Sequence, residues 1–241
     1  MIARGFCGGI LILCGLAMPM VLSGCNHTGK PAVGSEAQRP DQVMDFSRLY
    51  AENCAGCHGA DGTHGASLAL ANPEYQAIVD EGTLTAAIST GVDGTLMPAF
   101  AKSAGGMLTD DQIFALVDGM RSHWYKADTL KGLDAPPYNT DKKGDVAHGQ
   151  QVFTAHCASC HTTGVQQKDA KQGSITDGSY LALIGDQSLR AIVIAGRPDI
   201  GHPDWRGVPG GPMSDQDVTD VVAWISSQRQ KTPGQPYPSQ P

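Results

Sequence analysis

Two copies of one five-residue pattern constrain what this chain can fold into more than any other feature of its 241 residues. Residues 54–58 read Cys-Ala-Gly-Cys-His and residues 157–161 read Cys-Ala-Ser-Cys-His, so the second histidine lies 103 positions after the first. Further residues match at an offset of 105: Tyr75 and Tyr180, Leu84 and Leu189, Gly91 and Gly196, Gly105-Gly106 and Gly210-Gly211, Asp110 and Asp215. The chain is therefore an internal duplication.

Cys-x-x-Cys-His is the attachment pattern of c-type haem. Two thioether bonds fix the porphyrin, and the adjacent histidine lies beside the iron as its proximal ligand. A zinc site would need paired motifs that converge on one ion, and this spacing does not provide them. The sequence predicts two covalently bound haem c groups, with Cys54, Cys57, Cys157 and Cys160 as thioether residues and His58 and His161 as iron ligands.

The N-terminus has the features of a secretory signal. Arg4 precedes an apolar stretch over residues 10–22 that is too short to cross a membrane, which predicts a signal peptide over residues 1–24. Leu22-Ser23-Gly24-Cys25 resembles the bacterial lipobox, and that resemblance implies cleavage before Cys25 and a diacylglycerol group on its thiol. An ordinary cleavage site at small residues is the alternative.

These assignments account for all seven cysteines of the chain. Cys7 and Cys14 leave with the signal peptide, Cys25 takes the lipid, and the four cysteines of the two motifs remain. No thiol is left for a disulfide or for a catalytic cysteine.

Helical signals dominate each half. Thr109-x-x-Gln112 and Ser214-x-x-Asp217 are helix start patterns, and apolar residues follow them at helical spacing. A further helix is predicted to run into each motif, over about residues 45–54 and 147–157. Strand-like alternation of useful length does not occur, so the predicted fold class is all-α.

Two positions predict how the first and last helices of each half cross. Eight residues before the first motif cysteine, Phe46 in the first half corresponds to Gly149 in the second. On the last helix, Gly119 corresponds to Trp224. A close crossing places a large side chain over a small one, so this exchange keeps the summed volume nearly constant.

Segments rich in proline, glycine and polar residues mark the domain boundaries. The predicted parts are a signal peptide (1–24), a flexible tether (25–40), a first domain (41–125), a linker (126–145), a second domain (146–230) and a Pro-rich tail (231–241). Residues 41–125 and 146–230 are called the first half and the second half below. The tether, linker and tail are expected to carry no chemistry.

Both halves resemble the class I cytochrome c family. The resemblance implies two tandem small helical domains, each wrapping one haem, with a methionine in the loop before the last helix as the sixth iron ligand. Met97-Pro98-Ala99-Phe100 is similar to that loop, which implies Met97 as the distal ligand of the first haem. Met107 and Met120 compete for that role, but Met107 is too close to the helix cap and Met120 belongs to the apolar stripe.

The second half departs from the family pattern. His202 occupies the position that corresponds to Met97, and Pro203 matches Pro98. We therefore expect His202 as the sixth ligand of the second haem, with Met213 or an open iron as alternatives. Methionine ligation raises the haem potential relative to two imidazoles, so one haem of higher and one of lower potential is predicted.

The other histidines are interpreted without a ligand role. His64, His148 and His156 are expected at the surface, His27 lies in the tether, and His123 suits the C-terminal dipole of its helix. Arg197, Tyr75 and Tyr180 have the chemistry to bind haem propionates, but packing explains them equally well.

The charge composition excludes one class of binding partner. The formal charge is −7, from 17 Lys+Arg and 24 Asp+Glu, and the chain has no basic run. Phosphate-backbone binding needs a basic footprint, so nucleic acid is not an expected partner.

The predicted function is that of a lipid-anchored electron carrier on the extracytoplasmic (periplasmic) side of a membrane. Its expected partners are redox proteins: a quinol-oxidising complex, a terminal oxidase or a reaction centre. The alternatives are a dihaem, peroxidase-like enzyme with one exchangeable haem site, and a fixed cytochrome subunit of a larger complex.

Overall fold

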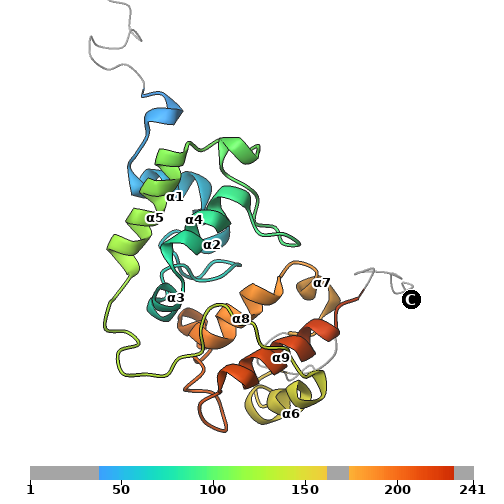
Figure 1. Cartoon of the computed structure of the whole chain (residues 1–241). Coiled ribbons are helices and arrows are strands. Elements are labelled where there is room, and N and C mark those ends of the chain that lie inside the picture. The colour runs from blue at the N-terminus through green and yellow to red at the C-terminus, as the bar shows by residue number, and fades with distance from the viewer. Residues whose placement is uncertain (1–37, 162–173, 231–241) are drawn as a thin grey trace, which may run out of the picture. The chain divides into compact units, whose positions relative to one another are not determined.

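A computed structural model describes residues 38–161 and 174–230 (Figure 1). The predicted signal peptide, the lipidation site Cys25, nearly all of the tether and the Pro-rich tail lie outside the described residues. Within the described ranges the chain is all-α, as predicted, and its β structure is limited to two isolated bridges, Ala101 with Leu108 and Arg197 with His202. None of the described helices is long and apolar enough to cross a membrane.

Nine α-helices and three short 3₁₀ helices are found in the described ranges. The α-helices are α1 (Phe46–Asn53), α2 (Ala55–His58), α3 (Pro73–Ile78), α4 (Glu81–Thr90), α5 (Asp110–Trp124), α6 (Val146–His156), α7 (Gly178–Leu181), α8 (Asp186–Ala195) and α9 (Asp215–Ser227). The 3₁₀ helices are η1 (Pro40–Gln42), η2 (Lys102–Ala104) and η3 (Pro198–Ile200). The duplication relates α1 to α6, α3 to α7, α4 to α8 and α5 to α9.

Both predicted helix start patterns form capping boxes. The Thr109 hydroxyl accepts from the Gln112 N–H at 3.2 Å, and the Gln112 side chain accepts from the Thr109 N–H at 3.1 Å. Ser214 and Asp217 exchange the same two bonds at the start of α9, at 3.1 and 2.9 Å. These reciprocal bonds satisfy backbone donors that a helix N-terminus otherwise leaves unpaired, and they fix where α5 and α9 begin.

The predicted helix crossings are confirmed. A Cβ atom on Gly119 of α5 would overlap the ring of Phe46 on α1. A Cβ atom on Gly149 of α6 would lie 2.8 Å from Cβ of Trp224 on α9 and would overlap the carbonyl oxygen of Asp220. Figure 1 shows both helix pairs. Each crossing is close because one helix contributes a glycine where the other contributes a bulky ring.

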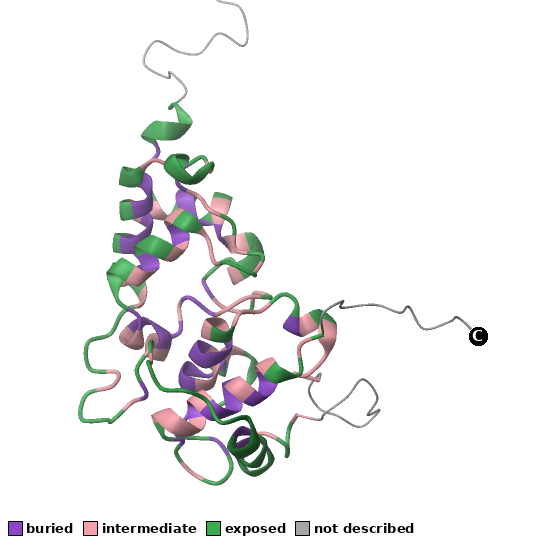
Figure 2. Ribbon diagram, turned by 45° about the vertical axis from the view of Figure 1, so that its right-hand side comes forward, coloured by how far each residue is buried: buried purple, intermediate pink, exposed green. Residues whose placement is uncertain are grey.

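Each half has an apolar core, and the core of the first half also includes Ala191 and Ala195 of α8. In the first half it includes Leu49 of α1 and Ile113 and Leu116 of α5, which are at most 2% exposed. In the second half, Val218 and Val221 of α9 are fully buried. Figure 2 shows buried positions inside each half, where packed helices face one another.

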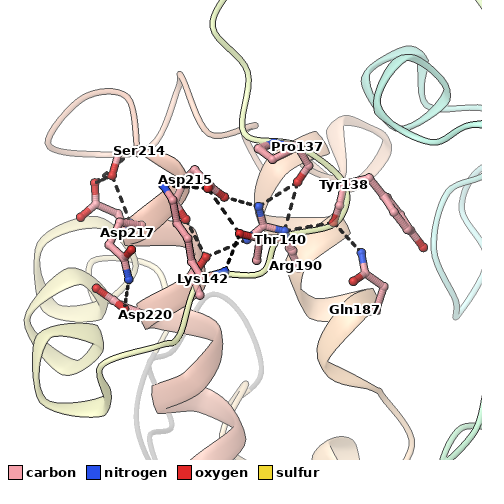
Figure 3. Close-up of polar contacts among 12 residues, drawn as sticks. Pro137, Tyr138, Thr140, Lys142, Gln187, Arg190, Ser214, Asp215, Asp217 and Asp220 are labelled. Atoms are coloured by element: carbon pink, nitrogen blue, oxygen red, sulfur yellow. Dashed lines mark hydrogen bonds and ion pairs between the residues drawn. The ribbon is translucent and has the colours of Figure 1, made fainter.

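The linker is docked on the second half. Arg190 of α8 is 4% exposed and donates to the carbonyls of Pro137 and Tyr138, at 2.8 and 3.0 Å (Figure 3). Arg190 also forms an ion pair with Asp215. Asp215 forms a second ion pair with Lys142, at 2.8 Å. Residues 137–142 therefore lie on α8 and the start of α9 as an ordered segment, a role that their composition did not indicate.

Candidate haem sites

The first motif lies where two short helices meet. Cys54 ends α1 and begins α2, and its N–H donates to the Tyr50 carbonyl at 2.8 Å. The Cys54 side chain is buried, and that of Cys57 is exposed. Burial raises the pKa of the free Cys54 thiol to about 11. No disulfide joins any cysteines of the described ranges, so all four motif sulfurs are available for thioether bonds.

His58 is held in the tautomer that a metal ligand needs. Its Nδ1 lies 2.8 Å from the carbonyl oxygen of Leu68, so Nδ1–H donates to that oxygen and Nε2 keeps its lone pair. Burial lowers the pKa of His58 and favours the neutral ring, the form that binds metals. The loop that supplies the acceptor is tied back to the motif by the Ser67 N–H, which donates to the Cys57 carbonyl at 2.9 Å.

The three methionines of the first half that compete for the ligand role occupy different environments. Met97 is half-buried against the first core, on the loop that leads to α5. Two backbone hydrogen bonds fix that loop. The Met97 N–H donates to the Thr95 hydroxyl at 3.1 Å, and the Met97 carbonyl accepts from the Val92 N–H at 3.1 Å. Met107 is 80% exposed, and Met120 of α5 is 1% exposed inside the core of the first half.

The second site brings two histidine rings close to each other. Cys157 ends α6, Cys160 is exposed, and His161 is half-buried. The ring centre of His161 lies 5.8 Å from that of His202, with the ring planes at 44°. An imidazole nitrogen binds a first-row metal at about 2 Å, so this separation leaves room for one metal ion that both rings would hold.

The loop around His202 fits a ligand role. Backbone bonds of 3.0 and 2.9 Å join Arg197 and His202 in both directions. The buried Nδ1 of His202 makes no hydrogen bond of ordinary geometry among the described residues. Burial, and then the neighbouring His161, lower the pKa of His202 and favour its neutral form. Met213 is instead 2% exposed in the second core, where its N–H donates to the Trp205 carbonyl.

The four further histidines of the described ranges are held by protein groups. His148 pairs with Asp220 at 2.7 Å, His156 bonds the Pro209 carbonyl, His123 bonds the Gly119 carbonyl, and His64 bonds the Thr63 hydroxyl.

Sequence comparison matches both halves. Residues 146–229 match the family "Cytochrome c", and residues 41–118 match "Cytochrome C oxidase, cbb3-type, subunit III". Cytochrome c6 of Synechocystis sp. is 33% identical over 96 residues, which are 39% of this chain and 73% of that relative. This chain belongs to the cytochrome c family. It is a dihaem c-type cytochrome of the electron-transfer class, with one cytochrome c domain in each half.

Two further relatives extend the match. Cbb3-type cytochrome c oxidase subunit FixP of Bradyrhizobium diazoefficiens is 26% identical over 170 residues, which are 66% of this dihaem cytochrome and 53% of FixP. The solved structure of cytochrome c6 from the diatom Phaeodactylum tricornutum aligns at 26% identity with a TM-score of 0.28, over 35% of this chain and 93% of that one. This cytochrome therefore spans about half the length of FixP.

Sequence reasoning assigned no role to Arg197 of this cytochrome, which the structure buries. Arg197 is 7% exposed and forms a two-pronged ion pair with Asp199, at 2.9 and 2.7 Å. Its guanidinium also donates to the carbonyls of Ser67 and Gly65 in the first half, at 2.8 and 3.1 Å. The signal in the sequence was a break in the duplication, because Val92 occupies the corresponding position.

Proposed function

We propose that this protein is a lipid-anchored dihaem cytochrome that carries single electrons between redox complexes on the extracytoplasmic side of a membrane. The observation that supports it most is the pair of Cys-x-x-Cys-His motifs, whose histidines His58 and His161 would be the proximal iron ligands. Haem, when bound, supplies a one-electron iron couple. Cys25 is the proposed lipid attachment point.

The chain's own residues would set the two sites apart. We assign His58 and Met97 to the first haem and His161 and His202 to the second. Leu68 orients His58 through its carbonyl, and the paired backbone of Arg197 and His202 fixes the second ligand loop. A thioether ligand favours reduced iron, so the first haem is expected to have the higher potential.

Near-infrared magnetic circular dichroism of the oxidised holoprotein tests this assignment, because methionine-ligated, bis-histidine and high-spin haems give separable bands. One methionine-ligated and one bis-histidine haem is the expected result. Two methionine-ligated haems would assign Met213, in place of His202, as the sixth ligand of the second haem. A large high-spin fraction would mean an open iron and would favour a peroxidase-like enzyme over a carrier.

A terminal oxidase is the proposed partner, because the name of the FixP relative identifies that protein as an oxidase subunit. A tethered shuttle and a fixed oxidase subunit differ in how they purify. Extraction in mild detergent should leave a shuttle alone, whereas a fixed subunit would co-purify with oxidase haem and activity.

A further inference from the structure

The contact between the halves contains buried polar groups beside the apolar packing of α3 against α8. Asn72 of the first half is 3% exposed, and its side-chain amide donates to the carbonyls of Ala195 and Gly196 in the second half, at 2.9 and 3.1 Å. Asp199 accepts from the backbone N–H of His64 at 2.8 Å. Such groups stabilise only in the arrangement that pairs all of them, so they specify one geometry of the contact.

Arg197 lies at the centre of this contact. The side chains of Arg197 and Asp199 are 8% and 5% exposed. A guanidinium has donors in a rigid planar fork, and Arg197 uses that fork for Asp199 on its own loop and for Ser67 and Gly65 across the contact. A lysine has the charge but cannot reproduce this set of bonds.

Arg197 connects the loop that orients His58 with the loop that carries His202, through its side chain on one side and its backbone on the other. On the first-half side, Ser67 directly precedes Leu68, whose carbonyl orients His58. On the second-half side, the backbone of Arg197 pairs with that of His202 in both directions.

The sequence encodes this contact only once. At the offset of 105, Val92 and Gly94 correspond to Arg197 and Asp199. The first half therefore has no equivalent of this ion pair, which occurs at positions where the two halves differ in sequence.

We propose that Arg197 is a positioning residue shared by both haem sites, which holds the loop that orients His58 and the loop that carries His202 in one fixed arrangement. This inference rests on the proposed ligand roles of those two histidines. Its ion pair with Asp199 is neutral as a whole, so it places no net charge between the sites. Loss of the arginine alone would leave a buried carboxylate, which favours oxidised iron.

The test is a potentiometric titration of the purified holoprotein, with an electron paramagnetic resonance spectrum of each ferric haem. Arg197→Gln should lower both midpoint potentials, including that of the first haem in the other half. Arg197→Gln with Asp199→Asn should remove the charge effect but keep an altered resonance of the first haem. Arg197→Lys keeps the charge and should also alter that resonance, and it remains informative if the glutamine variant does not fold.

Arg206 provides a matched control. It pairs across the same contact with Glu74 at 3.2 Å, but its side chain is 38% exposed and it donates to no carbonyl of residues 65–68 among its described bonds. Arg206→Gln should leave both haem signals unchanged. The proposal is overturned if the Arg197 variants change the second haem alone or match Arg206→Gln. A wild-type protein without two haem signals would instead refute the proposed function.

Discussion

The side-chain amide of Asn72 donates to the backbone carbonyl of Ala195 at 2.9 Å, across 123 residues of sequence. The carbonyl oxygen of the same side chain accepts from Glu74 and Tyr75 and caps α3. Asp177, at the corresponding position of the second half, caps α7 in the same way but has no donor. The Asn72 amide can therefore cap a helix and donate to the other half at once, whereas the Asp177 carboxylate can only cap its helix.

Asn72→Asp should separate these two roles. The cap survives, while two buried carbonyls lose their donor and face a carboxylate, so we expect the holoprotein to lose about 1–3 kcal/mol of unfolding free energy. Denaturant unfolding measures the change. Asp177→Asn, which only exchanges the capping group, is the control and should change stability by less than about 0.5 kcal/mol. Equal effects of the two substitutions would refute a bridging role for Asn72.

Gly119→Ala should destabilise the first half by overpacking. The new methyl group would overlap the ring of Phe46, and such overpacking costs about 1–3 kcal/mol. Adding Phe46→Leu should recover part of that loss, because the smaller side chain makes room. A double-mutant cycle by thermal unfolding gives the coupling, and strict additivity would show that the two residues are not in contact.

The pair of His148 and Asp220 should make the stability of the second half depend on pH. The hydrogen bond to Asp220 raises the pKa of His148, against a smaller opposing effect of desolvation. The charged pair is therefore stabilising below the ordinary histidine pKa, and its contribution is lost as pH rises through the raised value. His148→Gln keeps a donor but not the charge, so it should melt below wild type at about pH 5.5 and alongside it at about pH 9. A melting difference that does not vary with pH would contradict this assignment.

Met97→Ala should convert the first haem to a high-spin or water-ligated form, because it removes the proposed sixth ligand. Loss of the methionine band in near-infrared magnetic circular dichroism is the readout. Met107→Ala is the matched control, since Met107 is 80% exposed and its loss should leave the spectrum intact. Retention of the band in Met97→Ala would assign the ligand to another methionine.

Cys25→Ser should release the protein from the membrane fraction, because lipidation at the lipobox requires that thiol. Fractionation and metabolic labelling with a radioactive fatty acid check this. Cys14→Ser, which lies inside the predicted signal peptide, should still give labelled, membrane-bound protein. Continued labelling of Cys25→Ser would place the lipid elsewhere or refute the anchor.

Local chemistry made much of the fold predictable. A capping box involves residues three positions apart, so Thr109 and Ser214 could be identified as helix starts without knowledge of their surroundings. The helix crossings were predictable for a different reason. The duplication supplied two versions of one contact, and a compensating exchange of Phe46 and Gly119 for Gly149 and Trp224 predicted the crossing that the structure shows, where two unrelated substitutions were the alternative.

The linker shows where composition alone misleads. A segment rich in proline and polar residues reads as a spacer, yet its backbone carbonyls are the acceptors that satisfy the buried guanidinium of Arg190. Carbonyls carry no sequence signal, because every residue has one.

The sequence by itself determined the all-α fold, the duplication, the attachment chemistry of Cys-x-x-Cys-His and the candidate ligands, since each depends on residue type at short spacing or on comparison of the two halves. Only the tertiary structure decided that His202 faces His161 across 5.8 Å and that Arg197 and Asn72 join the halves. Those contacts link groups as many as 132 residues apart. Most of their acceptors are backbone carbonyls, whose positions depend on how the chain folds and not on which side chains they bear.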